Sequence, residues 1–174
     1  MSFAYPGPAD QGRRLRTMLQ AYAHAGGRHA AVLVHSEQAG SRLLDELGRG
    51  ARVDSSLQGL PARVLPLGVW HTASIGIDLW LTAIAQGASQ VWVLATAEEA
   101  PEYRQALTEQ MAVAQAVLTG LGYAGQHFRL LEAKDARDLA DLDAALRAPA
   151  AATVARTAAF AAQADKRATL DLAI

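Results

Sequence analysis

The chain has 174 residues, 51% of them hydrophobic, so its length suits one domain with a sizeable buried core. The 16 lysines and arginines nearly balance the 17 aspartates and glutamates, which leaves no basic field for nucleic acid or acidic lipid. Cysteine is absent, and this excludes disulfides, thiolate nucleophiles and any iron–sulfur cluster bound by cysteines of these residues.

No apolar run approaches the roughly 20 residues that a membrane-spanning helix needs. Residues 1–8 lack the charged and then apolar layout of a secretory signal. We therefore expect a cytoplasmic protein that binds neither membrane nor nucleic acid.

The first half of the chain alternates helical and strand patterns. Residues 9–27 carry an amphipathic stripe that stops at two glycines, which predicts a leading helix. The short apolar run 29–35 predicts a strand buried on both faces. Ser36 is expected to cap a helix that ends at Gly48 or Gly50. A second strand is predicted over residues 62–67, and Pro66 indicates either a sheet edge or the end of that strand.

The second half continues this alternation. Residues 72–86 are apolar almost all round and predict one buried helix. Strands are expected over residues 90–95 and 128–131, and helices from Pro101 to the glycines at 120 and 122 and over residues 134–147. The pattern predicts an α/β fold with three layers, in which a mainly parallel four-stranded sheet of flavodoxin or Rossmann type has helices on both faces.

Residues 28–148 thus form the predicted α/β core of a single domain that spans residues 1–174. Residues 149–174 are rich in alanine, with apolar residues at helical spacing, and predict a C-terminal helical segment. Because no residue of the last ten would end a helix, we expect this segment to continue in a longer parent chain. Its apolar face makes a homodimer conceivable.

Polar side chains gather in the loops after the predicted strands, where open parallel sheets bind ligands. His35 and His71 could shuttle protons, and Ser74 at a helix start could hold an anion with free N–H groups. Three glutamates before and within the next helix would repel phosphate there, so any anion that binds is expected at residues 72–76. The candidate ligand-binding residues are His35, Ser36, Trp70, His71, Thr72, Ser74, Thr96 and Glu98.

Recognised enzyme motifs for dinucleotide, nucleoside triphosphate or acyl transfer are absent, and the five histidines show no metal-ligand spacing. The absence of these motifs favours a noncatalytic domain, but two alternative functions remain. One is a nucleotide- or flavin-binding module in the crevice at the carboxyl ends of the strands. The other is an enzyme with His71 or His35 as general base and Glu98 as its acid partner.

Two segments carry a resemblance to a known family. Residues 64–80, VLPLGVWHTASIGIDLW, and residues 83–96, AIAQGASQVWVLAT, resemble the iron–sulfur delta subunit family of methyl-viologen-reducing hydrogenase. The resemblance spans about residues 29–135 and includes Tyr103, Arg104 and the Leu121-Gly122-Tyr123 turn. In that family, a strand and a cysteine-bearing loop lead into a helix, and a later loop carries two further cysteines.

The family's cysteines are missing here, and the last two align with Thr96 and Pro101. The domain is therefore expected to bind no cluster and no other cofactor. A closer resemblance is to bacterial 4Fe-4S ferredoxin-type proteins, in which a cysteine-free domain is joined to cysteine-rich modules, and residues 164–174 resemble a stretch of those chains.

This resemblance implies a noncatalytic scaffold or docking domain in an electron-transport protein associated with oxidoreductases. The 4Fe-4S clusters would lie in the parent protein outside these residues. The implied partners are ferredoxin modules of the same polypeptide or subunits of redox enzymes.

Overall fold

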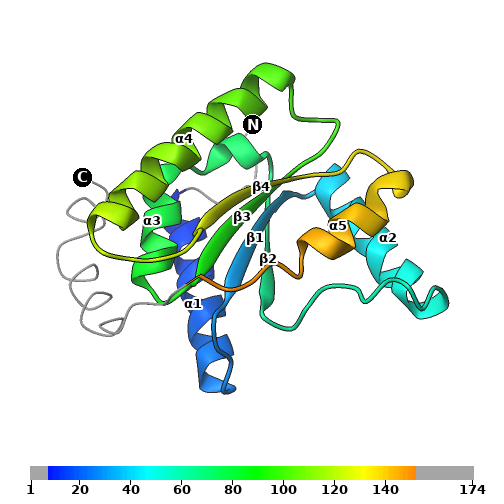
Figure 1. Ribbon diagram of the computed structural model, residues 1–174, viewed down its shortest axis with the longest axis horizontal. Coiled ribbons are helices and arrows are strands. Elements are labelled where there is room, and N and C mark those ends of the chain that lie inside the picture. Colours follow the sequence, from blue (N-terminus) through cyan, green and yellow to red (C-terminus); the bar gives the residue numbers. More distant parts are fainter. Residues whose placement is uncertain (1–7, 152–174) are drawn as a thin grey trace.

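The computed structural model describes residues 8–151, and its centre is a parallel sheet of four strands (Figure 1). The strand order is β2-β1-β3-β4, and every neighbouring pair is parallel. The strands are β1 (Ala31–Ser36), β2 (Val64–Val69), β3 (Gln90–Ala95) and β4 (Phe128–Glu132). All residues of β1 and β3 are buried, because these strands lie inside the sheet with helices over both faces.

Helices cover both faces of the sheet, so the predicted three-layer α/β fold is confirmed (Figure 1). One apolar cluster packs α1, α3 and α4 against one face, and a second packs α2 and α5 against the other. The helices are α1 (Pro8–His24), α2 (Ala39–Val53), α3 (Ile77–Ala85), α4 (Pro101–Gly120) and α5 (Leu139–Ala145). None of the helices within residues 8–151 is long and apolar enough to cross a membrane.

The sheet has a topological switch point between β1 and β3. From β1 the chain crosses over α2 to β2 at one edge, and it then returns over α3 on the opposite face to β3 on the other side of β1. The loops after β1 and β3 therefore leave the sheet in opposite directions, which is where ligands of open α/β sheets bind. The predicted site residues thus belong to the expected edge.

Two predicted helices have different bounds in the structure. The helix predicted for residues 72–86 is a 3₁₀ turn at Thr72–Ser74 followed by α3, because Ile75 and Gly76 adopt extended backbone between them. Helix α2 continues beyond both glycines to Val53. The packing of its buried leucines outweighs the cost of about 1 kcal/mol per helical glycine.

The remaining differences are small. The strand predicted for residues 62–67 begins two residues later, and its edge position is confirmed, with Pro66 opposite Leu33. The helix predicted for residues 134–147 is a 3₁₀ turn at Ala136–Asp138 that leads into α5.

The chain crosses the amino ends of the strands after α5. The Gln90 side-chain amide donates to the Pro149 carbonyl at 3.1 Å, and the Ser89 hydroxyl donates to the Ala151 carbonyl at 2.8 Å. Residues 149–151 are not helical. The rest of the predicted C-terminal helical segment, and the homodimer suggested for it, lie outside the described residues.

Candidate functional site

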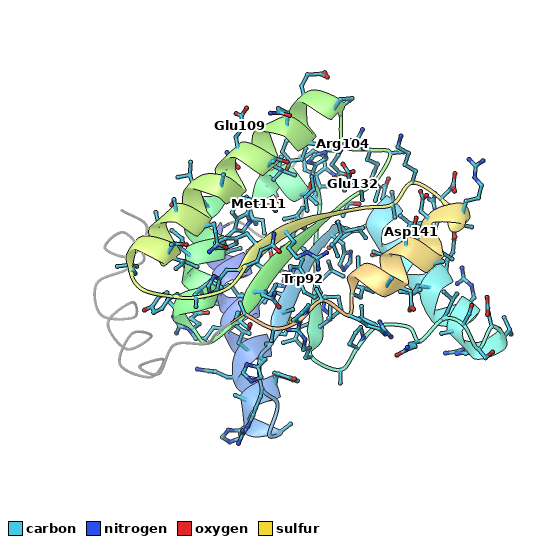
Figure 2. All side chains as sticks on the ribbon, in the orientation of Figure 1. Trp92, Arg104, Glu109, Met111, Glu132 and Asp141 are labelled. Atoms are coloured by element: carbon cyan, nitrogen blue, oxygen red, sulfur yellow. The ribbon has the colours of Figure 1, made fainter. Side chains whose placement is uncertain are left out.

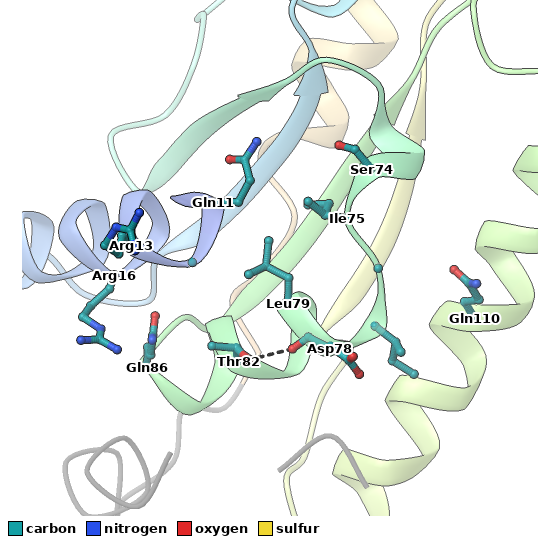
Figure 3. A pocket seen from close by; sticks show the side chains of 13 residues that line it. Gln11, Arg13, Arg16, Ser74, Ile75, Asp78, Leu79, Thr82, Gln86 and Gln110 are labelled. Atoms are coloured by element: carbon teal, nitrogen blue, oxygen red, sulfur yellow. Dashed lines mark hydrogen bonds between the residues drawn. The ribbon is translucent and has the colours of Figure 1, made fainter. Parts of the chain in front are cut away.

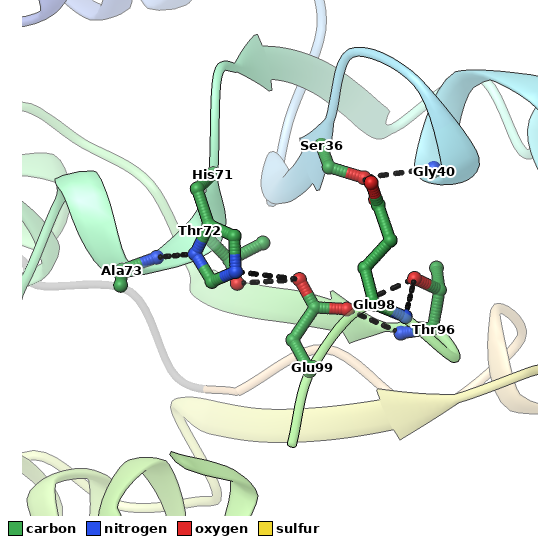
Figure 4. Close-up of polar contacts among 8 residues, drawn as sticks. All are labelled: Ser36, Gly40, His71, Thr72, Ala73, Thr96, Glu98 and Glu99. Atoms are coloured by element: carbon green, nitrogen blue, oxygen red, sulfur yellow. Dashed lines mark hydrogen bonds and ion pairs between the residues drawn. The ribbon is translucent and has the colours of Figure 1, made fainter.

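Side chains from three loops meet at the carboxyl ends of the strands (Figure 4). The Ser36 hydroxyl, at the end of β1, donates to Glu98 Oε1 at 2.8 Å and accepts the Gly40 N–H at 2.9 Å. The Thr72 hydroxyl, after β2, donates to Glu99 Oε2 at 2.9 Å. We call this set the strand-end network, and it consists of Ser36, His71, Thr72, Thr96, Glu98 and Glu99.

Glu99 is the centre of the strand-end network. Its residue is 1% exposed, and its Oε1 accepts the backbone N–H of Thr96 at 2.6 Å and the Thr96 hydroxyl at 3.0 Å. With the Thr72 hydroxyl, three donors therefore satisfy this buried carboxylate. The sequence alone predicts no role for Glu99 beyond the negative charge that it places before the next helix. The Thr-x-x-Glu spacing of residues 96–99, typical of a capping box, was the available signal.

His71 is held by both ring nitrogens. Its Nδ1 accepts the Ala73 N–H at 3.0 Å, so in the neutral ring Nε2 carries the proton, and Nε2 lies 3.9 Å from Glu99 Oε2. A general base needs a lone pair directed at substrate, and neither nitrogen offers one in this arrangement. The acid residue beside His71 is Glu99, whereas Glu98 contacts Ser36. The Tyr103 ring lies 5.4 Å from the imidazole, and burial raises the pKa of Tyr103.

The amides expected to hold an anion at residues 72–76 already have acceptors in part. The Ala73 N–H donates to His71 Nδ1, and the Ser74 N–H donates to the His71 carbonyl at 2.8 Å. Ser74 itself lines a cavity of about 620 Å³ between α1, α3 and α4 (Figure 3). Trp70, His71 and Thr72 do not line that cavity, so Ser74 is separated from the other candidate residues of the loop after β2.

His35 is buried in a slot between two glycines. A Cβ at Gly40 would lie 2.9 Å from His35 Cβ, and one at Gly68 would lie 3.3 Å from His35 Cε1. The ring Nδ1 lies 2.9 Å from the Ser36 carbonyl, which can only accept, so Nδ1 carries the proton. Burial lowers the pKa of His35 below its usual 6.5, despite the opposing effects of the Ser36 carbonyl and of Glu37.

The lowered pKa of His35 predicts that acid weakens the fold. Well above pH 6.5 the imidazole is neutral in both the folded and the unfolded chain. Below about pH 6.5 the unfolded chain binds a proton at this imidazole, whereas folded His35 stays neutral until the pH is lower. The free energy of unfolding should therefore decrease as the pH is lowered. This group contributes at most about 1.4 kcal/mol per pH unit, until the folded imidazole is also protonated. Denaturant unfolding between about pH 7.5 and pH 5 measures this slope.

His35→Gln should flatten this pH slope, whereas His24→Gln, at the exposed end of α1, should leave it unchanged. An equal slope in the wild-type chain and in His35→Gln would contradict the assignment to His35.

The structure thus groups five of the eight predicted residues in the strand-end network, namely Ser36, His71, Thr72, Thr96 and Glu98. His35 packs beneath this edge of the sheet, Trp70 is 61% exposed beside it, and Ser74 faces a separate cavity. Within residues 8–151, no group of three His, Asp or Glu side chains is placed to hold a metal ion. Comparison of the chain with protein-family models and with curated proteins finds no match.

Proposed function

We propose that this chain is a noncatalytic α/β domain of a ferredoxin-type iron–sulfur electron-transfer protein, with the role of a scaffold or docking domain. The domain binds no cluster, and the 4Fe-4S clusters belong to cysteine-rich modules elsewhere in the parent polypeptide. Its partners are those modules or subunits of redox enzymes, and its compartment is the cytoplasm.

The strand-end network is the observation that carries this proposal. In the hydrogenase family that the sequence resembles, cysteines align with Thr96 and Pro101, which bracket the loop after β3. Here that loop places the buried carboxylate of Glu99 between Thr96 and Thr72. Hydrogen bonds between hydroxyls and carboxylates join the three loops, and they use the hydroxyls that a ligand would otherwise engage. This arrangement favours a structural role for the edge.

The proposal predicts iron in the parent protein and none in this domain. The native polypeptide, purified from its own cells, should be much longer than 174 residues. It should contain iron and acid-labile sulfide, and it should absorb visible light. The isolated chain should remain colourless after anaerobic incubation with iron and sulfide, because it has no thiolate. A cysteine-rich ferredoxin treated in the same way is the positive control.

Two results would reject the proposed function. One is a native polypeptide that ends with these residues and contains no iron. The other is stoichiometric uptake of iron and sulfide by the isolated chain.

A further inference from the structure

A glutamate and a tryptophan directly follow β1 and β2 at the carboxyl ends of these strands. Ser36 pairs with Val69 in the last register position, and the Glu37 N–H donates to the Val69 carbonyl at 2.8 Å. The next residues, Glu37 and Trp70, are therefore neighbours across the end of this ladder. Both are exposed, and the Trp70 residue retains 61% of its accessible surface. An exposed tryptophan is typical of the residues that anchor protein interfaces.

The imidazole of His35 borders the same place. His35 is 7% exposed, and because its Nδ1 carries the proton, its Nε2 presents a lone pair. A Cβ at Gly68 would lie 3.7 Å from His35 Nε2 and 3.5 Å from Glu37 Cγ, so both side chains flank the bare backbone of Gly68. Within the described part of the chain, the imidazole makes its hydrogen bond through Nδ1, so the Nε2 lone pair is available to a donor.

The charges around this place favour a cation. The carboxylates of Glu37 and Asp45 both act on the His35 imidazole, against one nearby cation, Arg14. The Arg14 guanidinium already lies near this place, but its hydrogen bonds go to the Gln11 side chain at 3.0 Å and to the Gly68 carbonyl at 3.2 Å, not to Glu37 or His35. A group that binds beside Glu37 and His35 must therefore donate hydrogen bonds and is stabilised by positive charge.

We propose that Trp70, Glu37 and His35 form a docking surface for an arginine side chain of a partner protein. The inference rests on the proposed docking role and names the chemistry of the partner at this edge. A guanidinium is planar, so it can stack on the indole while its N–H groups donate to the Glu37 carboxylate and to His35 Nε2. A lysine ammonium is a compact point charge without a planar face, so it cannot stack on the indole in this way.

Titration of the full 174-residue chain with N-acetylarginine amide tests the proposal. The indole N–H resonance of Trp70, assigned by its loss in Trp70→Phe, should shift with increasing ligand and saturate. N-acetylcitrulline amide has a similar shape without the charge and should bind at least about fivefold more weakly. Glu37→Gln should weaken binding of the arginine probe about threefold or more, since it removes the charge of the carboxylate.

Glu109→Gln is the matched control, because Glu109 is an exposed acid on α4 (Figure 2). It should bind the arginine probe like the wild-type chain. Three results would overturn the inference: no shift of the Trp70 resonance, equal binding of the citrulline probe, or full affinity in Glu37→Gln. Equal binding of N-acetyllysine amide would overturn the choice of arginine.

The two proposals fail separately. Arginine binding by a chain whose native polypeptide holds no iron would reject the proposed function and leave the arginine surface intact. An iron-containing parent protein whose domain ignores the arginine probe would reject only the docking surface.

Discussion

Replacing Glu99 with alanine is expected to lower the free energy of unfolding by about 3 kcal/mol. The substitution leaves the Thr96 N–H and the hydroxyls of Thr96 and Thr72 without their acceptor, in a place that is almost closed to water. Each buried donor without a partner costs about 1–3 kcal/mol. The loops after β2 and β3 also lose the contact that joins them. Chemical denaturation followed by far-ultraviolet circular dichroism measures the loss.

Two further variants separate the hydrogen bonds from the charge and from the general effect of removing an acid. Glu99→Gln keeps one carbonyl acceptor for Thr96, so it should lose only about 1 kcal/mol. Glu102→Ala removes an exposed acid from the first turn of α4 and should change the stability by about 0.5 kcal/mol or less. A loss below about 1 kcal/mol in Glu99→Ala would show that the strand-end network contributes little to the fold.

The sequence predicted the fold well because the local patterns and the tertiary structure agree. Strands β1 and β3 are continuous apolar runs, as strands covered on both faces must be, and helices separate all four strands. The parallel sheet followed from this alternation. Pro66 allowed an edge position or a strand end for β2, because proline lacks the N–H that an inner strand would need, and the structure shows the edge position.

The boundaries were less predictable where tertiary packing decided them. The composition of residues 72–86 is helical throughout, but the chain must first turn from β2 into the loop whose Thr72 reaches Glu99. Extended backbone at Ile75 and Gly76 makes that turn, and no periodicity in the apolar residues reveals it. Glycines in α2 likewise stay helical because buried leucines on the same helix hold it against the sheet.

The residues of the candidate site were predictable by position, but their partners were not. Parallel strands bring their carboxyl ends to one edge, and that rule alone selected Ser36, Thr72 and Thr96. Whether Glu98 or Glu99 points inward depends on the path of the loop after β3. In the structure, Glu99 turns back to cap Thr96 while Glu98 reaches Ser36, and this assigns Glu99 to His71.

The second large effect is expected in the core, where Trp92→Ala should lower the free energy of unfolding by about 3–5 kcal/mol. Trp92 lies on the inner strand β3, is fully buried, and packs with the cluster beneath α2 and α5 (Figure 2). The guanidinium carbons of Arg63 and Arg129 lie 5.3 and 5.5 Å from the centre of its ring. Removal of the indole thus opens a cavity and takes away the aromatic face that two partly buried cations contact.

Trp92→Phe distinguishes these contributions, because a phenyl ring still offers an aromatic face to both cations. The indole N–H of Trp92 is buried and has no hydrogen-bond partner within residues 8–151, so phenylalanine forfeits no hydrogen bond there. We expect Trp92→Phe to retain at least about half of the stability that Trp92→Ala loses. Trp70→Ala, at the exposed indole, should change the stability by about 0.5 kcal/mol or less. Equal losses in the Trp92 and Trp70 alanine variants would contradict the assignment of Trp92 to the core.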